Sequence, residues 1–291
     1  MSFHTVTYTS SVTAAAGLSA LAVATDTIFS PSGNAYLLPT EFKFVAAYAG
    51  GSNILRARIN APSLLRVGYP SIRPVQQVVT PAPSGTAAPN PNLMTLLENS
   101  VQLRTGEPVG IDAATSAAAG ENLVGAAWFM DKLDPVPAGE SFWLRFTSST
   151  LLSALAWKVV SPTFDQAFPS GTYAVIGLEF TSPSAVIARV IFPGSLWRPG
   201  VVAQTGSLSL GTVGLARTHR YFYDGTLGVF GYFQTSAPPS IEVFAISPDA
   251  SASQEGYLRV IRVGDVGATP PSAASGGKDA PAMSSSLMTR R

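Results

Sequence analysis

The chain has 291 residues, a formal net charge of +1, 46% apolar residues and only 12% charged residues. Its length exceeds the usual size of one hydrophobic core, so we expect two domains of about 130 residues with additional tails. High apolarity with few charges excludes an intrinsically disordered chain, and the absence of cysteine excludes disulfides and thiolate metal sites. A surface this poor in charge predicts extensive contact with other protein surfaces.

Short runs rich in β-branched and aromatic residues recur between clusters of Gly, Pro, Ser and Asn. This pattern is typical of all-β sandwiches and barrels, in which strands are joined by turns. In the first half, the expected strands cover residues 5–9, 22–29, 42–48, 54–60, 123–130 and 142–147. In the second half, they cover residues 156–160, 172–180, 185–192, 219–223, 227–233, 241–246 and 257–263. A helix is expected over about residues 92–103, where leucines at helical spacing follow two Pro-Asn steps.

Three short segments recur in the same order. Residues 18–22 match residues 152–156, residues 31–33 match residues 169–171, and residues 57–66 match residues 188–198. Each match alone is weak in a chain rich in Ala, Ser and Pro, but together they predict an internal duplication. We therefore expect a first repeat over residues 1–150 and a second repeat over residues 151–264.

Two segments are expected to lie outside the cores of the repeats. Residues 78–92 are rich in proline and predict a long surface loop of the first repeat. Residues 265–291 change in composition and predict a flexible, weakly basic C-terminal tail. The basic tail residues Lys278, Arg290 and Arg291 are candidates for contact with a genome or with lipid head groups, and the alternative is a tail that only aids solubility.

Membrane insertion and secretion are not expected. The most apolar stretch, residues 14–24, is about half the length that a spanning helix requires. Residues 1–4 contain no basic residue ahead of an apolar region, unlike a secretory signal.

The chain offers little for catalysis. His4 and His219 are its two imidazoles, and a packed or interface histidine is the preferred interpretation of His219. Asp131 and Asp134 are a candidate carboxylate pair, but their surroundings favour a turn between strands. The sequence contains no nucleophile elbow, phosphate loop or dinucleotide motif. We expect no enzymatic activity, no cofactor and no small-molecule substrate.

The matched segments place one arginine at the same point of each repeat. Arg58 and Arg189 each follow an alanine and precede a proline, Pro62 or Pro193, by four residues. A guanidinium has five donors in a plane, which suits either a clamp between barrels or subunits or an anchor for a loop within one domain. These two interpretations stay open. The structural and interface candidates are Arg58, Pro62, Arg66, Arg189, Pro193, Trp197 and Arg198.

The chain has two β-rich repeats, and in the first of them residues 44–49 lead into residues 57–66. In these features it resembles the double jelly-roll capsid proteins of tailless icosahedral phages. The resemblance implies two tandem jelly-roll domains, three chains in each pseudo-hexagonal capsomer, and in many members an enclosed lipid membrane. It also implies that the partners are further copies of the chain and other virion proteins such as penton or spike, with lipid or genome as possible contacts of the tail.

Two hypotheses follow. The first is a major capsid protein that self-assembles into a virion shell, with assembly in the host cytoplasm. The second is a carbohydrate-binding or receptor-binding β-sandwich, for which Trp157, Trp197 and Tyr69 are the candidate aromatic contacts.

Overall fold

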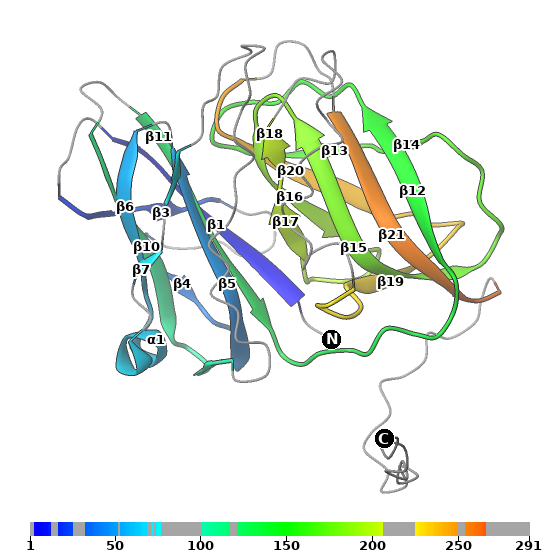
Figure 1. Cartoon of the computed structure of the whole chain (residues 1–291), viewed down its shortest axis with the longest axis horizontal. Coiled ribbons are helices and arrows are strands. Elements are labelled where there is room, and N and C mark those ends of the chain that lie inside the picture. The colour runs from blue at the N-terminus through cyan, green and yellow to red at the C-terminus, as the bar shows by residue number, and fades with distance from the viewer. Residues whose placement is uncertain are drawn as a thin grey trace, which may run out of the picture.

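The computed structural model of the chain describes residues 3–12, 17–25, 33–51, 53–68, 71–72, 74–76, 100–116, 121–205, 225–248 and 254–265 (Figure 1). The described residues are predominantly in strands, so the predicted all-β class is confirmed. Among them, α1 (Pro62–Val67) is the one α-helix, and no helix is long and apolar enough to span a bilayer.

The described strands form four sheets, numbered I to IV here in the order in which they stack across Figure 1. Sheets I and II make the first sandwich, and sheets III and IV make the second. Sheet I has the order β2 (Ser19–Ala20), β10 (Pro108–Thr115), β6 (Ile54–Asn60) and β7 (Ser71–Ile72), with β4 (Tyr36–Leu37) also on β10. Sheet II has the order β3 (Ala22–Val23), β1 (Phe3–Val12), β11 (Glu121–Met130), β5 (Phe42–Gly51) and β8 (Val75–Gln76), with β9 (Gln102–Leu103) also on β5.

The second sandwich repeats this arrangement. Sheet III has the order β13 (Trp157–Val160), β20 (Ser240–Ala245), β16 (Ala185–Ile191) and β17 (Gly200–Val202). Sheet IV has the order β14 (Thr163–Phe164), β12 (Ser141–Ser148), β21 (Gln254–Gly264), β15 (Thr172–Ser182) and β18 (Gln204–Thr205), with β19 (Gly231–Gln234) also on β15. In each sandwich the first long strand pairs with the last, which is consistent with a jelly roll.

Irregularities in strand pairing also fall at matching positions. In the pairing of β5 with β11, Val45 is a bulge residue that the register skips. In the pairing of β15 with β21, the register skips Ile176, 131 residues later. Pairing of β6 with β10 passes over Leu55, and pairing of β16 with β20 passes over Val186, again 131 residues later. Because a bulge bends its strand and is a specific feature of a fold, these positions give a residue-by-residue correspondence between the sandwiches.

A glycine paired with an aromatic residue on the adjacent strand is a second shared detail. Tyr8 lies opposite Gly125 in the β1–β11 pair, and Phe146 lies opposite Gly256 in the β12–β21 pair. A Cβ at Gly256 would overlap the Phe146 ring and approach the Glu179 carbonyl to 2.8 Å. The missing side chain therefore makes room for the ring in the core.

The strand predictions are largely confirmed, and three other expectations differ from the structure. The first concerns β12, which was expected in the first repeat. It pairs with β14 and β21 of the second sandwich, so the strands of the two sandwiches separate within residues 131–140 and not at residue 150. The second concerns the predicted helix: its residues 102–103 form β9, where Gln102 and Leu103 pair with β5, and residues 92–99 lie outside the described part of the chain. Also outside it are residues 78–92, 219–223 and 266–291.

The third difference concerns the segment matches. Arg58 and Arg189 occupy equivalent register positions, so that match is in phase with the structure. The match of residues 18–22 with residues 152–156 is out of phase, because Ala20 and Val159 are the residues that lie at equivalent points of β2 and β13. Small residues recur too often in this chain for so short a match to fix register.

Candidate functional site

Arg189 joins the two sandwiches. It lies on β16, where its Nη2 binds Oε2 of Glu242 on the paired strand at 2.5 Å. Its Nη1 donates to the main-chain carbonyl of Thr5 on β1 at 3.1 Å, and its guanidinium lies 3.6 Å from the ring centroid of Trp157. Only 1% of its surface is exposed. Of the two interpretations left open by the sequence, the structure therefore assigns Arg189 to a contact between sandwiches.

The loop after β16 binds the same strand. The Thr5 amide donates to the carbonyl of Arg198 at 3.0 Å, and the Arg198 amide donates to Nδ1 of His4 at 3.4 Å. The Arg198 guanidinium is turned back onto its own loop, donating to the Ser195 carbonyl at 2.7 Å. Arg198 thus shapes the loop, while the main chain of the loop makes the contact with β1.

Trp197 reaches from this loop into the first sandwich. Its ring lies edge-on to Phe42, with centroids 5.4 Å apart, and 5.9 Å from the ring of His4. It packs against the buried core cluster of the first sandwich although it belongs to the second. One aromatic side chain of the second sandwich therefore closes one end of the first.

Sheets II and III pack tightly around Trp128 and Gly200. The Trp128 indole Nε1 on β11 donates to the Gly200 carbonyl on β17 at 2.9 Å. A Cβ at Gly200 would lie 2.8 Å from Cγ of Arg189 and 2.9 Å from Oγ1 of Thr5, so the close approach requires glycine here. The outer face of sheet II shares one buried cluster with the second core, including Phe3, Tyr48, Ala126 and Trp128. The two sandwiches therefore form one continuous apolar stack.

Arg58 is the counterpart of Arg189 but lies at an uncovered face. Its Nε binds Oδ2 of Asp112 at 2.8 Å on the paired strand, and Asn60 donates to the same oxygen at 2.6 Å. Its side chain is 47% exposed. Within the described chain, Arg58 is thus held by its own sheet and presents its guanidinium on the outer face of sheet I.

Pro62 and Arg66 belong to α1, which follows β6. Pro62 begins the helix and Arg66 lies in its last turn, both exposed. The Ser63 amide donates to Oε1 of Glu107 at 2.6 Å, and the Ser63 hydroxyl donates to Oε2 at 2.8 Å. Burial alone would raise the pKa of Glu107, but hydrogen bonds from Arg104 and Ser63 outweigh it and lower the pKa below its ordinary value. The ionised carboxylate therefore caps α1.

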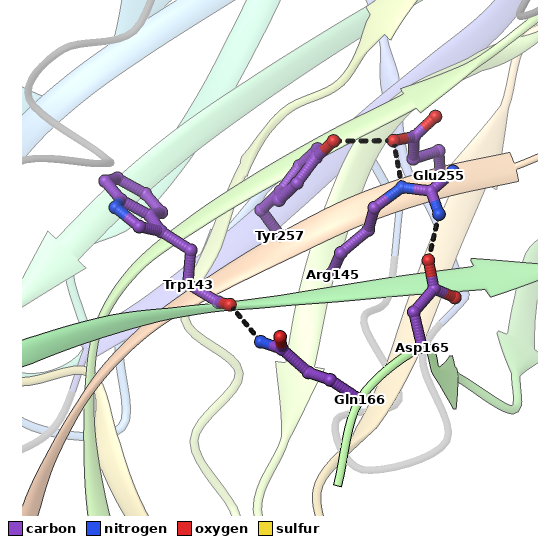
Figure 2. Close-up of polar contacts among 6 residues, drawn as sticks. All are labelled: Trp143, Arg145, Asp165, Gln166, Glu255 and Tyr257. Atoms are coloured by element: carbon purple, nitrogen blue, oxygen red, sulfur yellow. Dashed lines mark hydrogen bonds and ion pairs between the residues drawn. The ribbon is translucent and has the colours of Figure 1, made fainter. Parts of the chain in front are cut away.

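The outer face of sheet IV carries a polar network, shown in Figure 2. Arg145 Nε and the Tyr257 hydroxyl both donate to Oε1 of Glu255, at 2.6 and 2.7 Å, and Arg145 also pairs with Asp165. Partial burial alone would raise the pKa of Glu255, but these hydrogen bonds lower it below its ordinary value. The network keeps this part of the second sandwich's outer face charged, although Ala174, Ile176 and Ile261 form a buried apolar cluster with Val229 on the same sheet, whereas the corresponding face of the first sandwich is apolar and buried.

Gln166 covers the neighbouring part of this face. Its Nε2 donates to the main-chain carbonyl of Trp143 at 2.7 Å (Figure 2). The Arg259 guanidinium lies 4.8 Å from the centroid of the Trp143 ring. A glutamine side chain, a neutral donor, thus occupies a backbone acceptor on β12.

Of the predicted candidates, the structure brings Arg189, Trp197 and Arg198 together at the contact between sandwiches. It places Arg58, Pro62 and Arg66 on the far side of the first sandwich, and Pro193 in the exposed part of the β16–β17 loop. Lys278, Arg290, Arg291, Tyr69 and His219 lie outside the described residues. Sequence reasoning missed Thr5, Trp128 and Glu242. A signal existed for Glu242, since an acidic residue, Asp112 or Glu242, lies a similar distance after each repeated arginine.

The candidate tryptophans for carbohydrate binding are engaged elsewhere. Trp157 lies beneath Arg189 and 5.3 Å from Phe244, and Trp197 packs on Phe42. Asp131 accepts the Lys132 amide at 2.7 Å, but residues 132–137 do not form the predicted turn between strands. Within the described residues, no three His, Cys, Asp or Glu side chains gather as a metal site.

No protein-family model and no curated protein matches the chain. A search of solved structures finds the crystal structure of the major capsid protein P2 from Bacteriophage PM2, at 9% sequence identity and a TM-score of 0.24. The match covers 92% of this chain and 100% of that protein. A superposition with so low a TM-score does not carry the functional argument, which rests on the geometry of this chain.

Proposed function

We propose that the chain is the major structural protein of a virion shell, a capsid protein that assembles by repeating its internal contact between copies. The observation that carries this proposal is the stacking of two sandwiches with the same strand order, in which the outer face of sheet II packs on the outer face of sheet III.

This internal contact joins two different surfaces. Sheet I has the strand order of sheet III, and sheet IV has the strand order of sheet II. The faces left at the two ends of the stack are therefore the counterparts of the two faces that meet inside it. A head-to-tail contact of this kind generates a closed ring when its rotation closes and a filament when it does not. We propose a ring of three chains, whose six sandwiches form a pseudo-hexagonal unit.

Composition supports the same proposal. With 12% charged residues, the chain has few charges to keep its outer surfaces apart from other copies. Exposed apolar side chains such as Leu37, Leu65 and Leu196 add to the surface available for association.

The repeated strand order and the paired bulges support the further proposal that both sandwiches are jelly rolls derived from one duplicated unit. Contacts with penton or spike proteins, and contacts of Lys278, Arg290 and Arg291 with genome or lipid, remain parts of the proposal that follow from the virion setting. So does assembly in the host cytoplasm.

The test is the assembly state of the purified full chain. Light scattering over a range of concentrations is expected to detect trimers, and electron microscopy is expected to detect shells or rings with local six-fold outlines. A chain that stays monomeric at every concentration and binds glycans on an array would overturn the proposal in favour of a carbohydrate-binding module.

A further inference from the structure

This inference rests on the proposed function and deepens it. We propose that Arg58 of one copy binds the main-chain carbonyl of Trp143 in a second copy, and that Gln166 occupies this carbonyl until the copies meet.

The acceptor is identified by strand register. In the first sandwich, Trp128 precedes the bulge at Val45 and pairs with Thr5. In the second sandwich, Arg259 precedes the bulge at Ile176 and pairs with Trp143. Trp143 is therefore the residue of β12 that corresponds to Thr5 of β1.

Neighbouring hydrogen bonds give the same alignment. Two residues after Thr5, the carbonyl of Thr7 accepts the amide of Ala24 at 2.8 Å; two residues after Trp143, the carbonyl of Arg145 accepts the amide of Asp165 at 3.2 Å. Carbonyls two residues apart on a strand point to the same side. The carbonyls of Thr5 and Trp143 thus face equivalent edges of their sheets, where one accepts from Arg189 and the other from Gln166.

The donor is identified in the same way. Arg58 and Arg189 hold equivalent positions and each binds an acidic partner on the adjacent strand, Asp112 or Glu242. Arg189 uses Nη2 for its acid and Nη1 for the Thr5 carbonyl. Arg58 uses Nε for its acid and is 47% exposed, so its outer nitrogens are on the surface of sheet I.

The residues around the proposed Arg58–Trp143 contact also correspond to those around the Arg189–Thr5 contact. His4 on β1 contacts Trp197, and the residue of β12 at the position of His4 is Phe142, which is 39% exposed. Trp197 follows Arg189 by eight residues, and α1, at the corresponding place after Arg58, presents Leu65 at 51% exposure. We therefore expect the surface of α1 in one copy to lie against the end of β12 in another copy, as the Trp197 loop lies against the end of β1.

Charge favours the same arrangement. At the Trp143 carbonyl of sheet IV the donor Gln166 is neutral, whereas Arg58 on sheet I is a charged donor. Exchange of the neutral Gln166 donor for the charged Arg58 donor strengthens the hydrogen bond to the carbonyl.

Self-association of the full chain tests the two side chains. By analytical ultracentrifugation, Arg58→Ala is expected to weaken association by about tenfold or more, the usual effect of losing a hydrogen bond from a charged group. Gln166→Ala is expected to strengthen association by about two- to tenfold, because the competing donor is gone. Lys132→Ala, which removes an exposed charge from the segment between the sandwiches, is the control and should leave association unchanged.

Crosslinking tests the geometry independently, since the natural chain has no cysteine. Leu65→Cys chains mixed with Phe142→Cys chains are expected to give a covalent dimer with a short bis-maleimide, and neither variant alone should do so. Leu151→Cys, at an exposed position between β12 and β13, replaces either partner as the control.

The outcomes separate this contact from the proposed function. Trimers or shells that form equally well with Arg58→Ala and Gln166→Ala, without the mixed crosslink, would overturn the Arg58–Trp143 contact and leave the capsid proposal standing. A chain that stays monomeric at all concentrations would overturn both.

Discussion

Arg189 donates to the Thr5 carbonyl at 3.1 Å, so a side chain of the second sandwich binds the main chain of a strand 184 residues earlier. Glu242 and Trp157 hold the guanidinium in place on the second sandwich's side. The contact is fully buried, which gives its removal a predictable cost.

Arg189→Ala is expected to lower the free energy of unfolding by about 3–5 kcal/mol, because the substitution leaves the buried Glu242 carboxylate without its partner. Chemical denaturation monitored by circular dichroism measures the change. Arg58→Ala removes the equivalent pair, in which the guanidinium is half-exposed and Asn60 still donates to the buried Asp112, and is expected to cost about 1 kcal/mol. Equal losses for the two variants would contradict the assignment of Arg189 to the contact between sandwiches.

Trp128→Phe is expected to loosen the contact between sheets II and III. The substitution removes the hydrogen bond to Gly200 and leaves that buried carbonyl without its donor, a loss of about 1–3 kcal/mol. Proteolysis should then cleave faster within residues 131–140, the segment that joins the sandwiches. Trp143→Phe, at a part-buried site on sheet IV, is the matched control; unchanged cleavage in Trp128→Phe would show that this bond does not couple the sandwiches.

Gly256→Ala is expected to destabilise the second sandwich by about 1–3 kcal/mol, the usual cost of overpacking a core, because the new methyl group would overlap the Phe146 ring. Thermal unfolding measures the effect. Gly17→Ala, where a Cβ would have no atom within 4 Å, serves as the control. A Gly256→Ala protein as stable as the Gly17→Ala protein would contradict the packing of Phe146 on this glycine.

Glu107 is expected to make stability depend on acid pH. Its pKa is lowered in the folded chain, so its contribution to the free energy of unfolding is present above the unfolded pKa of about 4.3 and is lost as pH falls through the lower folded value. Unfolding in urea between pH 3 and pH 6 should show this loss, and Glu107→Gln should flatten it. The same slope in both proteins would exclude Glu107 as its source.

The strand pattern of this chain is readable from its sequence. β-branched and aromatic runs separated by turn residues predict β6 with its observed bounds and most of β5, β15 and β16, because residues that suit a half-buried pleated sheet act locally. The repeated Ala-Arg segment even places Arg58 and Arg189 in register. Strands with weak local signals, such as β10 with its Pro, Gly and Asp, and the short β17, were not predicted.

The partners of each strand were decided only by the tertiary structure. Nothing in residues 141–148 distinguishes a strand that ends the first sandwich from one that begins the second, because pairing with β21 depends on a segment more than 100 residues later. The same holds for the two arginines. Their sequence surroundings are alike, yet one is buried against Thr5 and the other is exposed, because stacking covers sheet III and leaves sheet I at the end of the stack. The sequence by itself determined the strands and the arginine that recurs in each repeat. Long-range packing determined that Arg189, and not Arg58, joins the sandwiches.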